Sequence, residues 1–518
     1  MEMPKPRGLI VAGLSGGSGK SVAAVGLVSA LRARQLRVLP FKKGPDYIDA
    51  GWLARAAGLP CYNLDPFLTR PEQLKATFHR HLHRADVALV EGNRGLYDGV
   101  NSSGSYSTAE LAVQLALPVL LVVNCTKTTR TMAALVLGCC LFDPRVRIAG
   151  VILNQVATSR HERILRECLA QSVDIPVVGI IPRMQTDIFP MRHLGLTPHQ
   201  EYRDADEAVA SLQQMAAAHF DLDAILGLMQ PLLPPTAAST STAQAAPPAR
   251  AAEPAAPTQA SPIRTKQPAR IGVLRDAAFQ FYYEENLEAL QDAGAELVMI
   301  NALTAASLPQ GAHCLHGLYI GGGFPETSAQ ALADNHRFRH SLCTAIEQGL
   351  PVYAECGGLI YLGRSIVLDG KEYPLTGIFP VTFSLSTKPQ AHGYSILRVE
   401  GDNSFYSQGL QIKGHEFRYS KVQQWSGQAS DLVFKVERGT GFAEGRDGLV
   451  YKNVLALYTH VLAAGTPEWV NGFMAAAMRH AQNNCVQSPG QASDLGTAVD
   501  RSQGILKNNS HGDEHATA

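Results

Sequence analysis

The sequence predicts two α/β domains, the first with a parallel β-sheet covered by helices. Three observations support this prediction. Short β-branched runs alternate with helix-compatible segments, a stretch rich in Ala, Pro, Ser and Thr separates two such halves, and 518 residues exceed what one hydrophobic core usually holds. The predicted parts are a first domain over 1–230, a linker over 231–269, a second domain over 270–481 and a tail over 482–518. We expect the linker and the tail to be disordered, because they offer few large apolar side chains to bury.

The first half contains a series of candidate strands that are apolar throughout and separated by helix-compatible segments. Strands with this pattern are typical of a parallel sheet with both faces covered. They lie at residues 9–12, 37–41, 87–90, 118–123, 148–153 and 176–180. Ligands of such sheets bind beyond the carboxyl ends of the strands. Polar side chains that directly follow these runs are therefore the candidate site residues.

The first candidate strand ends in Gly-Leu-Ser-Gly-Gly-Ser-Gly-Lys-Ser, and a helix-compatible run follows. A strand, a glycine-rich loop and a helix start are the context of a phosphate-binding loop. The backbone N–H groups and the helix N-terminus favour an anion, Lys20 adds a full charge, and Ser21 offers a hydroxyl to Mg²⁺. The predicted ligands of the ATP phosphates are Gly13, Gly16, Gly17, Ser18, Gly19, Lys20 and Ser21. Leu14 stands where the common pattern has its first glycine.

A charged cluster follows the second candidate strand, in Lys-Lys-Gly-Pro-Asp-Tyr-Ile-Asp over 42–49. Asp46 or Asp49 is suited to hold Mg²⁺, and the lysines are suited to meet phosphate or an acidic substrate. We expect Asp46 to bind the metal, and Lys42, Tyr47 and Asp49 to act on the substrate or its carboxylate. The alternative is a solvated loop after a strand.

The third candidate strand ends in Glu91, beside the predicted phosphate loop. A carboxylate at this position is suited to a second Mg²⁺ contact, direct or through water. The predicted metal ligands are therefore Ser21, Asp46 and Glu91. Asp98, a few residues later, either orients the substrate carboxylate or caps a turn. Asn154, after the strand over 148–153, is predicted to read the nucleotide base, with helix capping as the alternative.

The second half begins again with candidate strands at 270–274, 317–320 and 351–354 and a helix over 287–293. The last of these strands runs into Ala-Glu-Cys-Gly-Gly, the cysteine form of a nucleophile elbow. The helix start that follows favours a thiolate at Cys356, and the amides of Gly357, Gly322 and Gly323 are the predicted oxyanion donors.

A free thiol is mostly protonated at neutral pH, so Cys356 needs a base. His460, after the strand-like run over 454–459, is the predicted base. A buried cysteine and a core histidine are the alternatives for each residue taken alone.

Composition excludes several classes of protein. Lys plus Arg and Asp plus Glu both number 45, so no global charge favours nucleic acid or an acidic membrane. The nine cysteines form no C-x-x-C pair, which argues against a zinc site or a disulfide framework. The sequence contains no signal-peptide core and no apolar run near the ~18 residues that span a bilayer. We expect a cytoplasmic protein with small-molecule partners and no nucleic-acid or membrane partner. The sequence leaves the oligomeric state open, and a homodimer is one of the alternatives.

Taken together, the motifs resemble the cobyrinic acid a,c-diamide synthase family over residues 8 to about 480. The segments that carry the resemblance are Gly13–Ser21, Gly44–Asp49, Glu91–Gly92, Gly95–Gly99, Arg275–Phe279, Gly321–Glu326, Glu355–Gly358, Gly414–Phe417 and Tyr458–His460. The resemblance implies a dethiobiotin synthetase-like P-loop domain followed by a class I glutamine amidotransferase domain. It also implies a ligase of cobalamin biosynthesis that uses ATP and Mg²⁺ to activate the a and c carboxylates of a tetrapyrrole polycarboxylic acid, with glutamine as the nitrogen source.

Some positions depart from the family pattern. Asn93 and Arg94 stand where many relatives carry an apolar pair, and Arg418 stands where we expect histidine. Leu462 occupies the place of the glutamate that completes a class I amidotransferase triad. The resemblance therefore implies a Cys356–His460 pair, with any third residue coming from elsewhere.

Other functions remain open from the sequence. Hydrogenobyrinic acid is an alternative substrate, and nickel sirohydrochlorin a,c-diamide synthase or cobyric acid synthase is an alternative enzyme. A ParA/MinD-like ATPase switch with a non-catalytic second domain is the alternative from another class, although Ser15 stands where the signature lysine of that group would fall. ATP consumption that depends on a tetrapyrrole acid would distinguish the enzyme from the switch.

Overall fold

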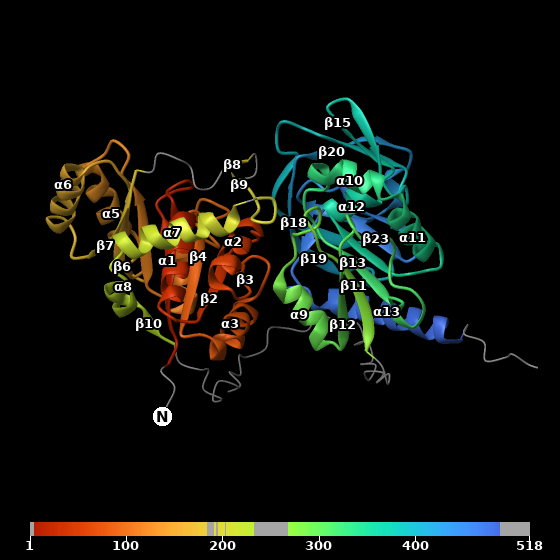
Figure 1. The fold of residues 1–518 in the computed structure, drawn as a ribbon, viewed down its shortest axis with the longest axis horizontal. Coiled ribbons are helices and arrows are strands. Elements are labelled where there is room, and N and C mark those ends of the chain that lie inside the picture. The colour runs from red at the N-terminus through yellow and green to blue at the C-terminus, as the bar shows by residue number, and fades with distance from the viewer. Residues whose placement is uncertain (1–4, 184–190, 193–194, 203, 233–267, 487–518) are drawn as a thin grey trace, which may run out of the picture.

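The computed structural model describes residues 5–183, 191–192, 195–202, 204–232 and 268–486, and it contains two α/β domains (Figure 1). The predicted linker and tail lie mostly outside these residues. Among the described residues, no helix is both long enough and apolar enough to cross a bilayer.

The first domain is organised around a parallel sheet with strand order β3-β2-β4-β1-β5-β6-β7. The strands are β1 (Arg7–Gly13), β2 (Val38–Lys43), β3 (Tyr62–Leu64), β4 (Val87–Gly95), β5 (Val119–Asn124), β6 (Ile148–Val156) and β7 (Val177–Pro182). All six strands predicted for this half are present. The edge strand β3 was not predicted, because three residues are too few for a periodic pattern.

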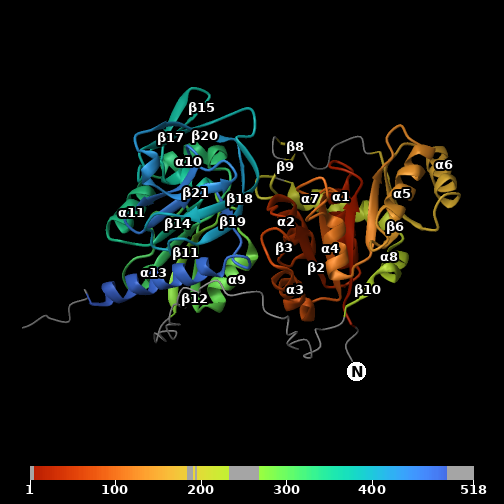
Figure 2. The ribbon, with the colours of Figure 1, turned by 180° about the vertical axis from the view of Figure 1, so that it is seen from behind.

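Helices cover both faces of this sheet, as the uniformly apolar strands predict. The helices α1 (Lys20–Ala33), α2 (Ile48–Ala57), α7 (Ala205–His219) and α8 (Leu222–Leu228) share one hydrophobic core with one face. The helices α3 (Pro71–Arg80), α4 (Thr108–Leu115), α5 (Arg130–Phe142) and α6 (Ser159–Ala170) cover the other face. Helices α5 and α6 lie at the end of this domain farthest from the second domain (Figure 2).

The first domain extends slightly beyond its predicted boundary at residue 230. Strand β10 (Gln230–Pro231) pairs antiparallel with the start of β1, and buried Leu232 packs into the core. Two short strands, β8 (Met191–Arg192) and β9 (Gly195–Leu196), form a separate two-stranded ribbon.

The second domain contains a ten-stranded sheet with strand order β12-β11-β13-β14-β23-β22-β21-β18-β19-β24. The strands β11 (Ala269–Leu274), β12 (Ala295–Ile300), β13 (Gly317–Ile320), β14 (Val352–Glu355) and β23 (Val454–Leu457) are parallel. The strands β18 (Ala391–Val399), β19 (Gln411–Arg418), β21 (Leu432–Arg438), β22 (Arg446–Tyr451) and β24 (His460–Val461) form an antiparallel wing. The candidate strands of this half, at 270–274, 317–320, 351–354 and 454–459, correspond to β11, β13, β14 and β23, and no strand of the antiparallel wing was predicted.

The remaining elements of the second domain complete the α/β layers. Its helices are α9 (Glu284–Asp292), α10 (Ala329–Asp334), α11 (His336–Glu347), α12 (Gly357–Leu362) and α13 (Pro467–Val486). A small sheet in the order β16-β15-β17-β20 is made of β15 (Ser365–Leu368), β16 (Lys371–Pro374), β17 (Val381–Leu385) and β20 (Ser420–Trp425). Helix α13 therefore continues a few residues past the predicted domain end at 481.

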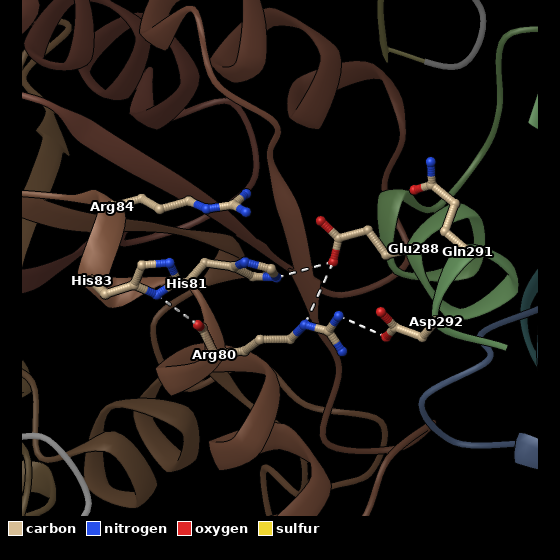
Figure 3. Close-up of a pocket in the computed structure, with 7 residues that line it drawn as sticks. All are labelled: Arg80, His81, His83, Arg84, Glu288, Gln291 and Asp292. Carbon is tan, nitrogen blue, oxygen red and sulfur yellow. Dashed lines mark hydrogen bonds and ion pairs between the residues drawn. The ribbon is translucent and has the colours of Figure 1, made fainter. Parts of the chain in front are cut away.

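The two domains meet through an apolar cluster and a polar groove. The apolar cluster joins Phe67 and Leu68 of the first domain to Tyr283 and Leu462 of the second. The groove encloses about 360 Å³ and is lined by Arg80, His81, His83, Arg84, Glu288, Gln291 and Asp292 (Figure 3). Arg80 pairs there with Asp292 at 2.6 Å. The groove lies near the amino end of β4, whereas the predicted site residues follow the carboxyl ends of strands, so we assign it to domain docking.

Candidate functional site

The predicted phosphate loop connects β1 to α1. Gly17 and Gly19 have φ of +75° and +89°, a region that favours glycine. The Ser18 hydroxyl donates to the Ser15 carbonyl at 2.7 Å, and Lys20 is the first residue of α1. Exposed Gly16 and Gly17 leave the backbone of the loop open to a ligand. This is the geometry of an anion site at a helix N-terminus.

Asn154, the predicted base reader, contacts this loop through a hydrogen bond to its backbone. Its Nδ2 donates to the Ser18 carbonyl at 2.9 Å, and its Oδ1 accepts from the Gln155 amide. A side chain at Gly19 would overlap the Asn154 amide. Asn154 therefore braces the phosphate loop, and base recognition stays a prediction.

A buried charge cluster lies beside the phosphate loop. The parallel register pairs Lys42 of β2 with Glu91 of β4, which brings both side chains to the same sheet edge. The Lys42 ammonium is 2.6 Å from an Asp49 oxygen, 3.2 Å from Glu91 and 3.8 Å from Asp46. The Ser21 hydroxyl donates to Glu91 at 2.7 Å and to Asp49 at 3.3 Å. The structure thus brings Ser21, Lys42, Asp46, Asp49 and Glu91 together, and their roles stay predictions.

The ionisation of the cluster reflects burial and mutual charge. Burial lowers the pKa of Lys42, but Asp49 and Glu91 outweigh this effect, so the pKa is raised overall. Burial and the charge of Asp49 raise the pKa of Asp46 to about 7. Burial also raises the pKa of Glu91. At Asp49 burial acts in the same direction, but the charges of Lys42 and Lys20 and the hydrogen bond from Lys42 together outweigh it, so the pKa is lowered. Lys42 thus remains a cation, and the surrounding carboxylates share it as their ion-pair partner.

The oxygen-rich donor set fits Mg²⁺, which usually takes one or two carboxylates together with waters and substrate phosphates. One oxygen of Glu91, Oε2, is buried without a hydrogen-bond partner. Within the described ranges, no group of three His, Cys, Asp or Glu side chains is arranged to hold a metal by itself. Ser21 and Glu91 are the best placed protein ligands, and phosphate oxygens would complete the shell.

Asp98 and Tyr47, two predicted substrate residues, make different contacts in the structure. The exposed Asp98 accepts from the Gly95 amide at 3.0 Å, so it caps the turn that follows β4. The Tyr47 ring packs against the second domain. It stacks on Phe281 at 5.2 Å between centroids, and it lies 5.4 Å from the ring of His460.

The predicted nucleophile elbow is present between β14 and α12. Cys356 has φ of +46° and ψ of −93°, a backbone conformation rare for residues other than glycine. Such strain is typical of a side chain held for chemistry. A Cβ on Gly357 would lie 2.9 Å from the amide nitrogen of Gly323, so these two predicted oxyanion donors are adjacent. Gly322 packs directly against the ring of His460, where a larger residue would clash.

Glu355 is a site residue that the sequence prediction missed. It is fully buried, and its Oε2 lies 3.4 Å from His460 Nδ1. The Val461 amide donates to its Oε1 at 3.1 Å, and the Tyr319 hydroxyl donates to its Oε2 at 3.3 Å. Its position immediately before the nucleophile was the available signal. Position 462, where a class I amidotransferase would carry the triad glutamate, is a leucine in this chain. Glu355 is the carboxylate that faces His460 instead.

The charge of His460 is set by its two neighbours. Burial lowers the pKa of His460, but interactions with Cys356 and Glu355 outweigh it and raise the pKa to about 10. The imidazolium form of His460 is therefore favoured at neutral pH. His415 stacks on His460 at 4.9 Å, and burial holds its pKa well below the ordinary value, so His415 stays neutral.

Replacing Glu355 by Gln is expected to lower the pKa of His460, because the carboxylate stabilises the imidazolium. An opposite charge at this range changes a pKa by about 1 to 3. The alkaline limb of the pH profile of glutamine hydrolysis should move to lower pH by a comparable amount. Glu347→Gln on the exposed face of α11 serves as the control. An unchanged profile in folded Glu355→Gln would remove Glu355 from the site.

The departures from the family pattern have structural roles. Leu462 is buried in the apolar cluster between the domains. Arg418 is also buried, and its guanidinium donates to the carbonyls of Ser420 and Gly441 at 2.6 and 2.7 Å. It lies 3.8 Å from the centroid of the Tyr458 ring. Arg418 therefore supports the fold beside the Cys–His pair and does not point into it.

Comparisons with known proteins cover both domains. A family model described as the CobQ/CobB/MinD/ParA nucleotide binding domain matches residues 9–194. A second, described as the CobB/CobQ-like glutamine amidotransferase domain, matches residues 270–467.

Curated relatives match almost the whole chain. A cobyrinate a,c-diamide synthase from Magnetococcus marinus is 42% identical over 87% of this chain and 93% of its own length. Proteins of the same name from Archaeoglobus fulgidus and Caldanaerobacter subterraneus are 37% and 34% identical, over 92% and 90% of this chain and 98% of each relative.

Proposed function

The chain belongs to the cobyrinate a,c-diamide synthase family, and from that membership we propose that it amidates the a and c carboxylates of cobyrinic or hydrogenobyrinic acid. ATP supplies the energy and glutamine supplies the nitrogen. The observation that carries the proposal is the segment Asp46–Asp49, which contributes two carboxylates to the charge cluster and places the Tyr47 ring 5.4 Å from the ring of His460. Two centres joined by one short segment suit the production of ammonia at one and its use at the other.

The first domain would activate the carboxylate. A carboxylate resists ammonia because it is anionic and has no leaving group. Its oxygen attacks the γ-phosphorus of ATP, ADP leaves, and an acyl phosphate forms. Lys20 and the loop amides stabilise the charge that develops on the phosphoryl group. Ser21 and Glu91 would hold Mg²⁺, which would supply positive charge to neutralise the phosphates.

The second domain would release ammonia from glutamine. The Cys356 thiolate attacks the side-chain amide carbon, and the amides of Gly357 and Gly323 stabilise the oxyanion. His460 gives its proton to the departing nitrogen, so ammonia leaves and a thioester remains. Water then hydrolyses the thioester, with His460 taking a proton, and glutamate is released. Ammonia attacks the acyl phosphate and displaces phosphate, so each amide consumes one ATP and one glutamine.

The proposal is tested by the products formed from three acids offered separately to the enzyme with ATP and glutamine. Mass spectrometry should detect a diamide from cobyrinic or hydrogenobyrinic acid and none from nickel sirohydrochlorin. A diamide only from nickel sirohydrochlorin would reassign the substrate. ATP hydrolysis that does not respond to any of the acids would instead favour the ATPase switch.

Tyr47→Ala is expected to uncouple the two centres, because the ring packs against His460 and belongs to the segment that carries Asp46 and Asp49. Ammonia that escapes into water becomes ammonium and is lost as a nucleophile. The ratio of glutamate released to amide formed should rise severalfold above the ratio in the parent enzyme, measured by parallel assays of both products. Tyr47→Phe keeps the ring and should stay near the parent ratio. An unchanged ratio in Tyr47→Ala would show that the ring does not confine ammonia.

A further inference from the structure

Exposed basic side chains lie near Phe67 and its stacking partner Tyr394 on the boundary between the domains. We call Arg94, Lys413 and Arg438 the seam cations. The Lys413 ammonium lies 5.1 Å and the Arg438 guanidinium 5.4 Å from the centroid of the Phe67 ring. One member comes from the first domain and two come from the second.

Tyr394 connects the seam cations to one another. Its ring stacks on Phe67 at 4.2 Å. Burial raises the pKa of Tyr394, and the charges of Arg94 and Arg438 oppose this rise. Arg94 also lies close enough to His392 to lower its pKa, after burial as the larger cause. Arg94 and Arg438 thus both act on the Tyr394 hydroxyl, although they come from distant segments.

Within the part of the chain that the structure describes, none of the seam cations forms an ion pair with a carboxylate. Asp65, which accepts from the Tyr394 hydroxyl, is fully buried, and its oxygens also accept from the amides of Phe67 and Leu68. Like charges gathered without compensation destabilise a fold. Their presence at an exposed boundary points to an anionic ligand.

The position of the seam cations relates them to both reaction centres. Arg94 lies three residues after Glu91 on β4. Tyr394 pairs in register with His415, which stacks on His460. Arg94 also has φ of +51°, in the left-handed region.

We propose that the seam cations bind peripheral carboxylates of the polycarboxylic acid substrate, so that both domains hold the substrate while one carboxylate at a time reaches Lys42 and the phosphate loop. The inference rests on the proposed function, which requires a substrate with several carboxylates. Guanidinium groups bind carboxylates through paired hydrogen bonds. A cationic patch also attracts a polyanion over about 8–10 Å at moderate ionic strength. Closure of the two domains on the substrate would bring the acid next to the source of ammonia.

The test measures KM and kcat for cobyrinic acid with saturating ATP and glutamine. Arg438→Glu and Arg94→Glu should each raise KM for the acid at least tenfold and change kcat by a smaller factor. Arg438→Ala should have a smaller effect in the same direction, and Arg438→Lys should restore most of the affinity. In the parent enzyme KM should rise with added salt, and this dependence should weaken in the charge-reversed variants.

Arg163→Glu on the exposed face of α6, at the far end of the first domain, is the matched control and should leave KM unchanged. The inference is overturned if KM for the acid stays at the parent value in Arg94→Glu and Arg438→Glu, or if Arg163→Glu raises it equally. If the parent enzyme amidates none of the acids, the proposed function fails instead. The two failures are therefore distinguishable.

Discussion

Cys356→Ser is expected to abolish amidation with glutamine while amidation with a high concentration of ammonium salt continues. Serine is a poor nucleophile at neutral pH because its hydroxyl stays protonated, so the thioester cannot form. Glutamine-dependent activity should fall by at least about 10³-fold. The first domain keeps its phosphate loop and charge cluster, so it can still activate the carboxylate and accept ammonia from solution.

The measurement compares initial rates with each nitrogen source on the same protein preparation. The strained backbone at Cys356, with φ of +46°, is retained when serine replaces cysteine, so folding should be preserved. Cys314→Ser provides a control at a partly buried thiol outside the elbow. Loss of ammonium-dependent turnover in a folded Cys356→Ser protein would contradict the division of labour between the domains.

Lys20→Ala is expected to abolish amidation with both nitrogen sources. The lysine supplies the only full positive charge within the loop itself, and phosphoryl transfer depends on such charges to stabilise the transferring group. Loss of preorganised electrostatic stabilisation of this kind costs about 10²–10³-fold or more in rate. ADP release and amide formation should fall together.

Lys20→Arg keeps a charge but changes its shape and separates electrostatics from geometry. Lys5→Ala, before β1, is the control for a lysine outside the loop. If Lys20→Ala lost glutamine-dependent activity alone, the phosphate loop would serve the amidotransferase centre, and the proposed activation step would be wrong.

Much of the fold followed from local sequence patterns. The uniformly apolar strands of the first domain predicted a buried parallel sheet, and β1, β2, β4, β5, β6 and β7 are all present. The antiparallel wing of the second domain was not predicted. Its strands alternate in burial, as in β18, and find partners far along the chain, so their pairing depends on registers that no short window contains.

The candidate site divides in the same way. Lys42, Asp46, Asp49 and Glu91 were expected to gather because parallel strands end at one sheet edge, and they do. That Lys42 sits at the centre of the carboxylates was not predictable, because the register between β2 and β4 sets this distance. Glu355 was missed because its role requires the strand that carries His460 to lie opposite it.

The sequence by itself determined the two segments whose chemistry is contained in consecutive residues, Gly13–Ser21 and Glu355–Gly358. Their glycines and their flanking strand and helix patterns specify a turn with few alternatives. Only the tertiary structure decided that Tyr47 reaches His460, and that Lys413 and Arg438 of the second domain lie over Phe67 of the first. Such contacts arise when whole domains bury apolar surface against each other. The hydrophobic effect that drives this burial is summed over many residues, so no short stretch of sequence reveals it.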